Sequence, residues 1–170
     1  MRELALRYVG KYATTRAKLR EYLTRKIREC GWTGEPPADL DALTDRFAEL
    51  GLVDDASYAL ARSRALSGRG YGKRRLAENL RVAGVDEDDS REALDAADAA
   101  AVTAALRFAE RRRIGPFAAQ TPDRAAREKA IAAMVRAGHA FGLSRAIAQL
   151  PPGASVDSSF IAEIWDGNLI

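Results

Sequence analysis

Cysteine and histidine are almost absent from the chain, which has one of each, Cys30 and His139, among 170 residues. A single cysteine cannot form an internal disulfide, which suits a reducing compartment. A structural zinc site takes four Cys or His ligands, so the sequence does not support one. We therefore expect no metal and no cofactor. Cys30 is expected to be a small buried side chain, and His139 a packed structural residue rather than a catalytic base.

Long apolar runs are absent as well. The longest stretch without charge, residues 146–156, contains Pro151 and Pro152 and is too short to span a bilayer. The chain starts without the charged segment and apolar run of a secretory signal. These absences predict a cytoplasmic protein without a membrane partner.

Strand-forming residues are scarce too. Aromatic residues make up 7% of the chain and β-branched residues are few, whereas alanine, leucine, arginine and glutamate dominate. The abundant types favour helices and the scarce types favour strands. The composition predicts an all-α protein.

An internal repeat with a period of 53 or 54 residues organises the chain. Residues 23–32, 76–85 and 130–139 each hold two apolar residues four apart, followed four residues later by a glycine. The matching residues are Leu23, Ile27 and Gly31; Leu76, Leu80 and Gly84; and Ala130, Met134 and Gly138. This spacing predicts an amphipathic helix in each copy, ended by a glycine in the left-handed conformation.

Each copy has a further helix before and after this one. The expected flanking helices are residues 4–12 and 40–50, 56–66 and 90–97, and 99–113 and 141–150. Thr121, Pro122 and Asp123 are interpreted as the N-cap, the first helical residue and a first-turn carboxylate. We predict nine helices in three three-helix repeats, residues 1–53, 54–98 and 99–150. The tail, residues 151–170, is expected to be flexible or to form a short helix.

Charge follows the same period. Residues 1–32 carry nine basic and three acidic side chains, and residues 33–60 carry one and seven. The counts are seven and one in residues 61–85, one and seven in residues 86–98, and nine and three in residues 99–150. Two basic helices and an acidic third helix therefore recur, although the last helix of the third repeat has no acid. In a stacked array, the basic helices would form a stripe along one side.

The first two repeats carry a recognisable pattern. The run LRYVGKYATTRAKLREYLTRKIRECGW is followed by FAELGLVDDASYALARSRALSGRGYGKRRLAENLRVAGV. The second run contains LGLVDD at residues 50–55, RSR at 62–64 and GRGYG at 68–72, and then a basic helix. Through these segments, residues 4–150 resemble the RecX family of recombination regulators. The resemblance is strongest in the middle repeat and loosest in the third, where Ala130 replaces a larger apolar residue.

The resemblance implies a curved, elongated molecule made of tandem three-helix repeats. It also implies a partner, the RecA recombinase polymerised on single-stranded DNA. Family members are understood to lie in the groove of that filament. There they limit its growth and damp ATP hydrolysis, strand exchange and the SOS response to DNA damage.

The clearest basic surface belongs to the helix expected at residues 72–83. On a helical wheel, Leu76, Leu80 and Ala83 share one side, and Arg74 and Arg81 share the opposite side. The functional interpretation is a contact stripe for DNA phosphates, single-stranded or double-stranded, or for acidic patches on a filament. The alternative is an ordinary solvated helix face. Aligning the repeats gives the candidate partner- and DNA-binding residues Arg20, Arg28, Arg69, Tyr71, Lys73, Arg74, Arg75, Arg81, Arg127 and Lys129.

Other motifs have a structural interpretation. The GRGYG segment lacks the preceding strand and the spacing of a phosphate-binding loop, so a tight interhelical turn explains its glycines. Asp54 and Asp55 suggest a metal or acid–base pair, but nothing nearby supports that, and helix capping is favoured. Trp32 and Tyr58 are expected in the core. The apolar tail cluster either docks on the body or binds a partner, and its members are Phe160, Ile161, Ile164 and Trp165.

These features predict a monomeric, non-enzymatic regulator that binds RecA filaments. A first rival is a sequence-independent DNA-binding protein that acts without the recombinase. It would need stacking aromatic residues between its basic residues, for which Tyr22 and Tyr71 are the few candidates. A second rival is an enzyme acting on nucleic acids, which would need clustered carboxylates, a phosphate-binding loop or a His/Cys site. The sequence shows none of these.

Overall fold

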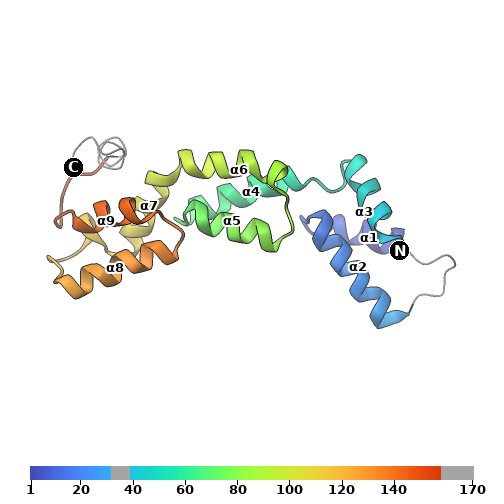
Figure 1. Cartoon of the computed structure of the whole chain (residues 1–170), viewed down its shortest axis with the longest axis horizontal. Helices are drawn as coiled ribbons and strands as arrows, with labels where there is room; N and C mark the ends of the chain where they lie inside the picture. The colour runs from blue at the N-terminus through green and yellow to red at the C-terminus, as the bar shows by residue number, and fades with distance from the viewer. Residues whose placement is uncertain (32–38, 158–170) are drawn as a thin grey trace. The chain divides into compact units, whose positions relative to one another are not determined.

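The computed structural model describes residues 1–31 and 39–157, and every regular element in this part of the chain is a helix (Figure 1). The α-helices are α1 (Arg2–Val9), α2 (Arg16–Cys30), α3 (Leu40–Glu49), α4 (Asp55–Gly68), α5 (Lys73–Val82), α6 (Glu87–Ala99), α7 (Ala101–Arg112), α8 (Arg124–Arg136) and α9 (Phe141–Gln149). A 3₁₀ helix, η1, spans Gly115–Phe117. The all-α prediction is confirmed. The interpretations of Trp32 and of the apolar tail cluster concern residues outside the described ones.

The helices form two compact units. One comprises Met1–Ala61 and Asn79–Glu92, and the other comprises Arg62–Glu78 and Ala93–Ile170. Residues of the predicted middle repeat occur in both units. The division into three repeats and the curved outline remain predictions.

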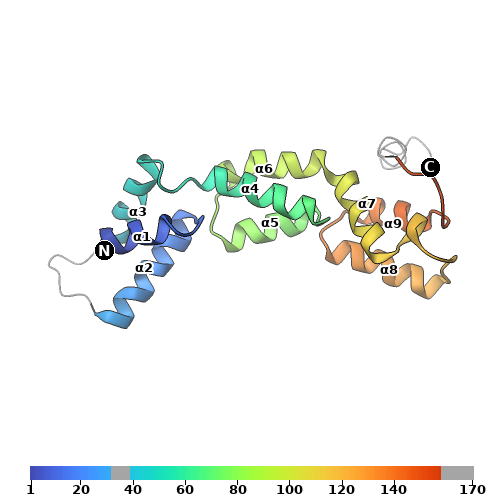
Figure 2. The ribbon, with the colours of Figure 1, turned by 180° about the vertical axis from the view of Figure 1, so that it is seen from behind.

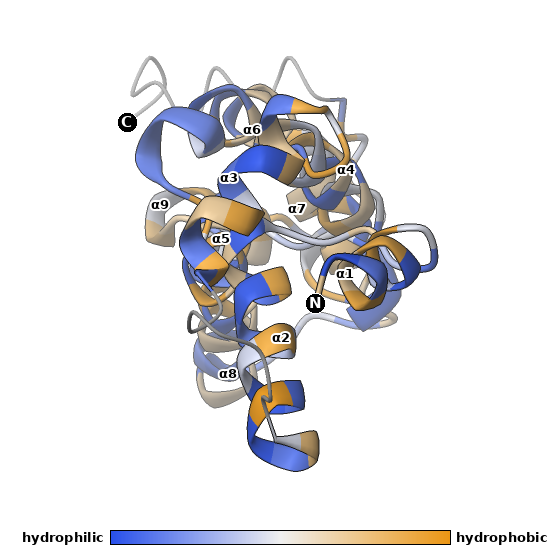
Figure 3. Ribbon diagram, turned by 90° about the vertical axis from the view of Figure 1, so that its right-hand side faces the viewer, coloured by the Kyte–Doolittle hydropathy of each residue, from blue (hydrophilic) through white to orange (hydrophobic). Residues whose placement is uncertain are grey.

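The core of the first unit is built on α1, α2 and α3, where α2 packs against both of the other helices. Hydrophobic and hydrophilic residues both occur along α2 (Figure 3), and its buried residues, Leu19 and Leu23, lie four apart and so on one side of the helix. Thr15 caps the start of α2 by accepting the N–H of Lys18 at 3.2 Å. The buried apolar residues are Ala5, Leu19, Leu23, Phe47 and Val53.

In the second unit, α7, α8 and α9 pack on one another, and η1 contacts α7 and α9 (Figure 2). The buried apolar residues are Ala105, Phe108, Ala109, Ile114, Met134, Ala137, Leu143, Ile147 and Ala148. The N-cap of α8 is Asp123, which accepts the N–H of Ala126 at 2.7 Å, so the assignment of Thr121 as N-cap was wrong by two residues. Both residue types cap helices well, and the charged carboxylate also interacts favourably with the helix N-terminus.

The three repeat glycines have the positive φ that the sequence predicts, with values of 74° at Gly31, 71° at Gly84 and 98° at Gly138. In the second and third copies, the residue after the glycine donates its N–H to the carbonyl five residues earlier, at 3.1 and 3.2 Å. These bonds satisfy carbonyls that the helix end leaves without partners. The predicted helix ends are confirmed at Gly84 and Gly138, whereas Gly31, with ψ at 162°, is not in the left-handed helical conformation that the sequence predicts.

Two predictions about buried side chains are wrong. Cys30 is exposed, because it is the last residue of α2 and the buried residues of that helix, Leu19 and Leu23, lie in its first half. Tyr58 is only partly buried, and its hydroxyl lies 2.7 Å from the Lys18 ammonium. A tyrosine hydroxyl that keeps a polar partner at the surface holds the ring near the rim of a core rather than inside it.

Candidate binding surfaces on the middle helices

The candidate residues lie on the three middle helices and in one turn between helices. Arg20 and Arg28 belong to α2, and Arg69 and Tyr71 to the turn between α4 and α5. The α5 candidates are Lys73, Arg74, Arg75 and Arg81, and the α8 candidates are Arg127 and Lys129. Eight of the ten therefore share one kind of element, the middle helix of a predicted repeat.

The orientation of α5 agrees with the helical wheel. Leu76 and Leu80 are each 1% exposed and Ala83 is buried with them, whereas Arg74 and Arg81 are exposed. The two arginines therefore face solvent because the leucines occupy the opposite, buried side of the helix.

Several candidates are already engaged within the fold. Arg20 lies 2.8 Å from Asp41, Lys73 lies 2.9 Å from Asp98, and Arg75 lies 2.9 Å from Glu78. The Arg127 guanidinium donates to the carbonyl of Pro122 at 3.3 Å, and the Arg69 guanidinium lies 5.6 Å from the centre of the Tyr71 ring. Within the described residues, four exposed cationic candidates have neither an ion pair nor a cation–π contact: Arg28, Arg74, Arg81 and Lys129. These four have the cationic groups most available to an outside partner.

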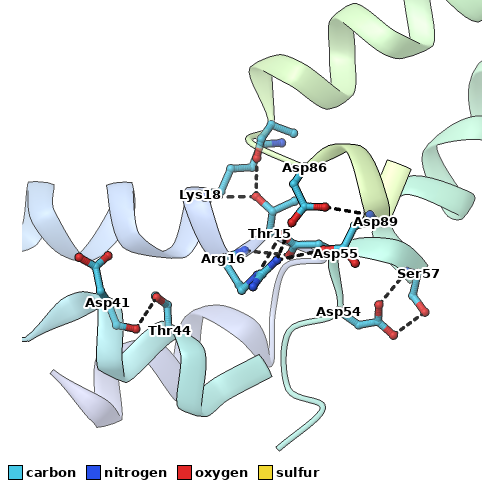
Figure 4. Close-up of polar contacts among 11 residues, drawn as sticks. Thr15, Arg16, Lys18, Asp41, Thr44, Asp54, Asp55, Ser57, Asp86 and Asp89 are labelled. Carbon is cyan, nitrogen blue, oxygen red and sulfur yellow. Dashed lines mark hydrogen bonds and ion pairs between the residues drawn. The ribbon is translucent and has the colours of Figure 1, made fainter. Parts of the chain in front are cut away.

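A polar cluster that the sequence did not reveal joins the start of α2 to the starts of α4 and α6 in the first unit (Figure 4). The Arg16 guanidinium lies 3.0 Å from Asp89, 3.3 Å from Asp86 and 3.4 Å from Asp55. The Asp55 side chain is 2% exposed, and it also accepts the backbone N–H of Arg16 at 2.9 Å. Burial raises the pKa of the Asp55 carboxyl, and the hydrogen bonds and charge of Arg16 oppose that effect. These ion pairs are internal contacts of the first unit.

The capping role predicted for the aspartate pair is correct for Asp54 and wrong for Asp55. Asp54 accepts the N–H of Ser57 at 2.8 Å, and this bond lowers the pKa of its carboxyl (Figure 4). Asp55 turns instead toward the start of α2, because Arg16 offers both a backbone N–H and a cation there.

In the second unit, α5 begins against the glycine turn that ends α8. The N–H of Gly72 donates to the carbonyl of Ala137 at 3.0 Å, and the N–H of Arg74 donates to that of Gly138 at 3.2 Å. A Cβ on Gly72 would collide with the Gly138 carbonyl, so the close approach requires glycine at this position. The last glycine of the GRGYG segment is thus explained by packing of the backbone.

The first unit contains a junction of the same kind. The Thr15 hydroxyl, at the start of α2, donates to the carbonyl of Ala83 at 2.6 Å. Ala83 and Ala137 each directly precede a repeat glycine. In each unit, therefore, one middle helix begins against the glycine turn that ends the next middle helix in the chain.

A second feature that could not be seen in the sequence is an open hollow beside α1 and α2. It is lined by three tyrosines and three cations: Tyr8, Tyr12, Tyr22, Arg7, Lys11 and Arg25. Of these three tyrosines, the sequence suggested only Tyr22 as a stacking aromatic, beside Tyr71 in the turn between α4 and α5. The signal that could have revealed the hollow is the spacing of four residues between Tyr8 and Tyr12, because this spacing places both rings on one side of a helical turn.

Groups that could hold a metal ion, made of three or more His, Cys, Asp or Glu side chains, do not occur in residues 1–31 and 39–157. Over the same residues, the helices are too short or too polar for any of them to cross a lipid bilayer.

Comparison with known proteins identifies relatives along most of the chain. The sequence model described as RecX, second three-helix domain, matches residues 54–94. A regulatory protein RecX of Myxococcus xanthus is 31% identical over 156 residues, which is 87% of this chain and 83% of the relative. One of Thermobifida fusca is 37% identical over 145 residues, or 84% of this chain and 74% of the relative. No solved structure gives a significant match. The identity and coverage of these relatives place the chain in the RecX family of regulatory proteins.

Proposed function

We propose that the protein binds the RecA filament assembled on single-stranded DNA and restrains its extension, its ATP hydrolysis and its strand exchange. Membership of the RecX family gives the class of partner. The observation that carries the proposal is that four of the candidate cations, Arg28, Arg74, Arg81 and Lys129, are exposed and have neither an ion pair nor a cation–π contact in the described structure.

The proposed mechanism is mechanical rather than chemical. Each middle helix presents at least one of these cations to solvent, and each can meet a phosphate or an acidic side chain on the filament. Several weak contacts made by one chain give an affinity that no single contact provides. A protein held in the groove in this way competes with the second DNA strand. We propose that the protein has no enzymatic activity of its own.

The test is the DNA-dependent ATPase of RecA filaments with increasing amounts of the protein. We expect ATP turnover to fall at amounts well below one protein per recombinase, because one bound molecule that stops extension affects many protomers. The protein alone should hydrolyse no ATP. An unchanged ATPase at equimolar protein would refute the proposed function.

Order of addition separates this proposal from a protein that only sequesters DNA. A filament regulator should inhibit preformed filaments, because it acts on the assembled recombinase. A protein acting only through free DNA should inhibit mainly when it meets the DNA before the recombinase does.

A further inference from the structure

The hollow beside α1 and α2 contains a stack of tyrosine rings. Tyr8 and Tyr22 are stacked, with ring centroids 4.1 Å apart and planes 17° apart. Tyr12 continues the group, with its ring 5.3 Å from that of Tyr8 at an angle of 49°. Tyr8 and Tyr22 also pack against the core of the first unit, so the stack rests on a fixed support.

Tyr12 is the solvent-facing end of this stack. It is 49% exposed and follows the end of α1, where its backbone N–H donates to the carbonyl of Tyr8 at 3.0 Å. The core of the first unit does not include it. The hydrogen bond fixes the backbone of Tyr12 while its ring stays open to a ligand, so little ordering is needed for binding.

Cations surround the tyrosines. The Lys11 ammonium lies 5.4 Å from the centre of the Tyr12 ring, and the Arg25 guanidinium lies 5.7 Å from that of Tyr22. Arg7 also lines the hollow and forms an ion pair with Glu3, and both side chains are exposed. An exposed ion pair contributes little to stability, so another anion can readily replace Glu3. Residues 1–32 carry nine basic and three acidic side chains, which makes the surroundings positive.

We infer that this hollow binds single-stranded nucleic acid, with a base on the exposed face of the Tyr12 ring and backbone phosphates on Lys11, Arg7 and Arg25. Aromatic rings interleaved with cations are the usual means of binding single strands without sequence preference, because every base has a face to stack. An acidic peptide would satisfy the cations but would leave the Tyr12 ring without a stacking partner. This inference does not depend on the proposed action on the recombinase.

The experiment measures binding of the full chain, without recombinase, to two fluorescent oligomers of about 20 nucleotides, oligothymidylate and an abasic strand of equal length. We expect Tyr12→Ala to weaken binding of oligothymidylate about five- to ten-fold and Tyr12→Phe to change it little. On the abasic strand, Tyr12→Ala should match the wild type, because no base is present to stack.

Charge is tested by the dependence of affinity on salt. Lys11→Ala should make the slope of log K against log salt less steep by about 0.7, the value for one phosphate contact on a single strand. Arg46→Ala removes an exposed arginine on α3 that does not line the hollow, and Leu6→Ala removes an exposed apolar side chain on α1. Both should leave the affinity for oligothymidylate at the wild-type value.

Two results would overturn the inference. One is wild-type affinity of Tyr12→Ala for oligothymidylate, with helicity and melting temperature unchanged. The other is tighter binding of a polyglutamate peptide than of oligothymidylate at equal charge and salt, which would assign the hollow to an acidic protein segment.

Discussion

His139 is the single histidine of the chain, and it is 2% exposed. Its Nε2 lies 3.1 Å from the carbonyl of Gly70, and its ring meets the edge of Phe108 with centroids 5.7 Å apart. Since a carbonyl only accepts hydrogen bonds, Nε2 must carry the proton. Burial lowers the pKa of His139, and the bond to Gly70 opposes that effect.

Stability should therefore fall when the solution is acidified through the ordinary titration range of histidine. Below about pH 6.5 the unfolded chain binds a proton at His139 that the folded chain resists, so protons favour unfolding. We expect the free energy of unfolding, measured with urea between about pH 7.5 and 5.5, to decline by up to about 1.4 kcal/mol per pH unit at the acidic end. His139→Phe should flatten this dependence. An equal slope in the variant would contradict the role of His139.

Residue roles were predictable where they depend on the nearest few residues. The pair of aspartates at the start of α4 indicated a cap, and Asp54 provides it by accepting the N–H of Ser57, three residues later. The role of Asp55 depends on Arg16, 39 residues away, and only the packed chain brings the two together. The stack of Tyr8 and Tyr22 could not be predicted from the sequence for the same reason, since it forms only when α1 packs on α2.

At the scale of elements, one side of α5 is buried and the opposite side faces solvent. Arg74→Glu with Arg81→Glu should shift the free energy of unfolding by no more than about 0.5 kcal/mol each, since both side chains are exposed. Binding to RecA filaments should weaken strongly. Lys73 is left out, because Lys73→Glu would face Asp98, which now pairs with Lys73 at 2.9 Å. Urea unfolding and filament pelleting measure the two effects.

The matched control is Leu80→Ala, on the buried side of α5. It should lower the free energy of unfolding by about 2–5 kcal/mol, because it opens a cavity. Under conditions where the variant stays folded, it should bind filaments as the wild type does. If the double reversal bound normally, Arg74 and Arg81 would be an ordinary solvated face.

The positions of the middle helices follow from local signals in the sequence. Apolar residues four apart and a glycine four residues later require only one helix and its end, and α2, α5 and α8 form where this pattern occurs. The junctions were not predictable in this way. A glycine at position 72 indicates a turn, but its contact with Gly138 depends on which surfaces meet in the folded chain.

At the scale of the whole molecule, the four exposed candidate cations that have neither an ion pair nor a cation–π contact within the described residues are distributed over all three middle helices. Arg28 belongs to α2, Arg74 and Arg81 to α5, and Lys129 to α8. Many other basic side chains are paired within the fold, as Arg16 is with three carboxylates. The number of basic residues therefore overstates the number of cationic groups that are available to a partner. The four cations define a smaller set to test.

If the protein contacts the filament at several points, reversals in different middle helices should act independently. Arg28→Glu, Arg74→Glu and Lys129→Glu should each weaken filament binding about three- to ten-fold, mainly by slowing association. In the triple variant these factors should multiply, because the three side chains share no partner. The measurement is the dissociation constant by surface binding or sedimentation at fixed salt. Arg145→Glu, on α9, makes the same change in charge at an exposed side chain outside the candidate set and should have little effect. A triple variant that binds no more weakly than the weakest-binding single variant would show that one helix carries the binding. An equal loss with Arg145→Glu would show that net charge matters and position does not.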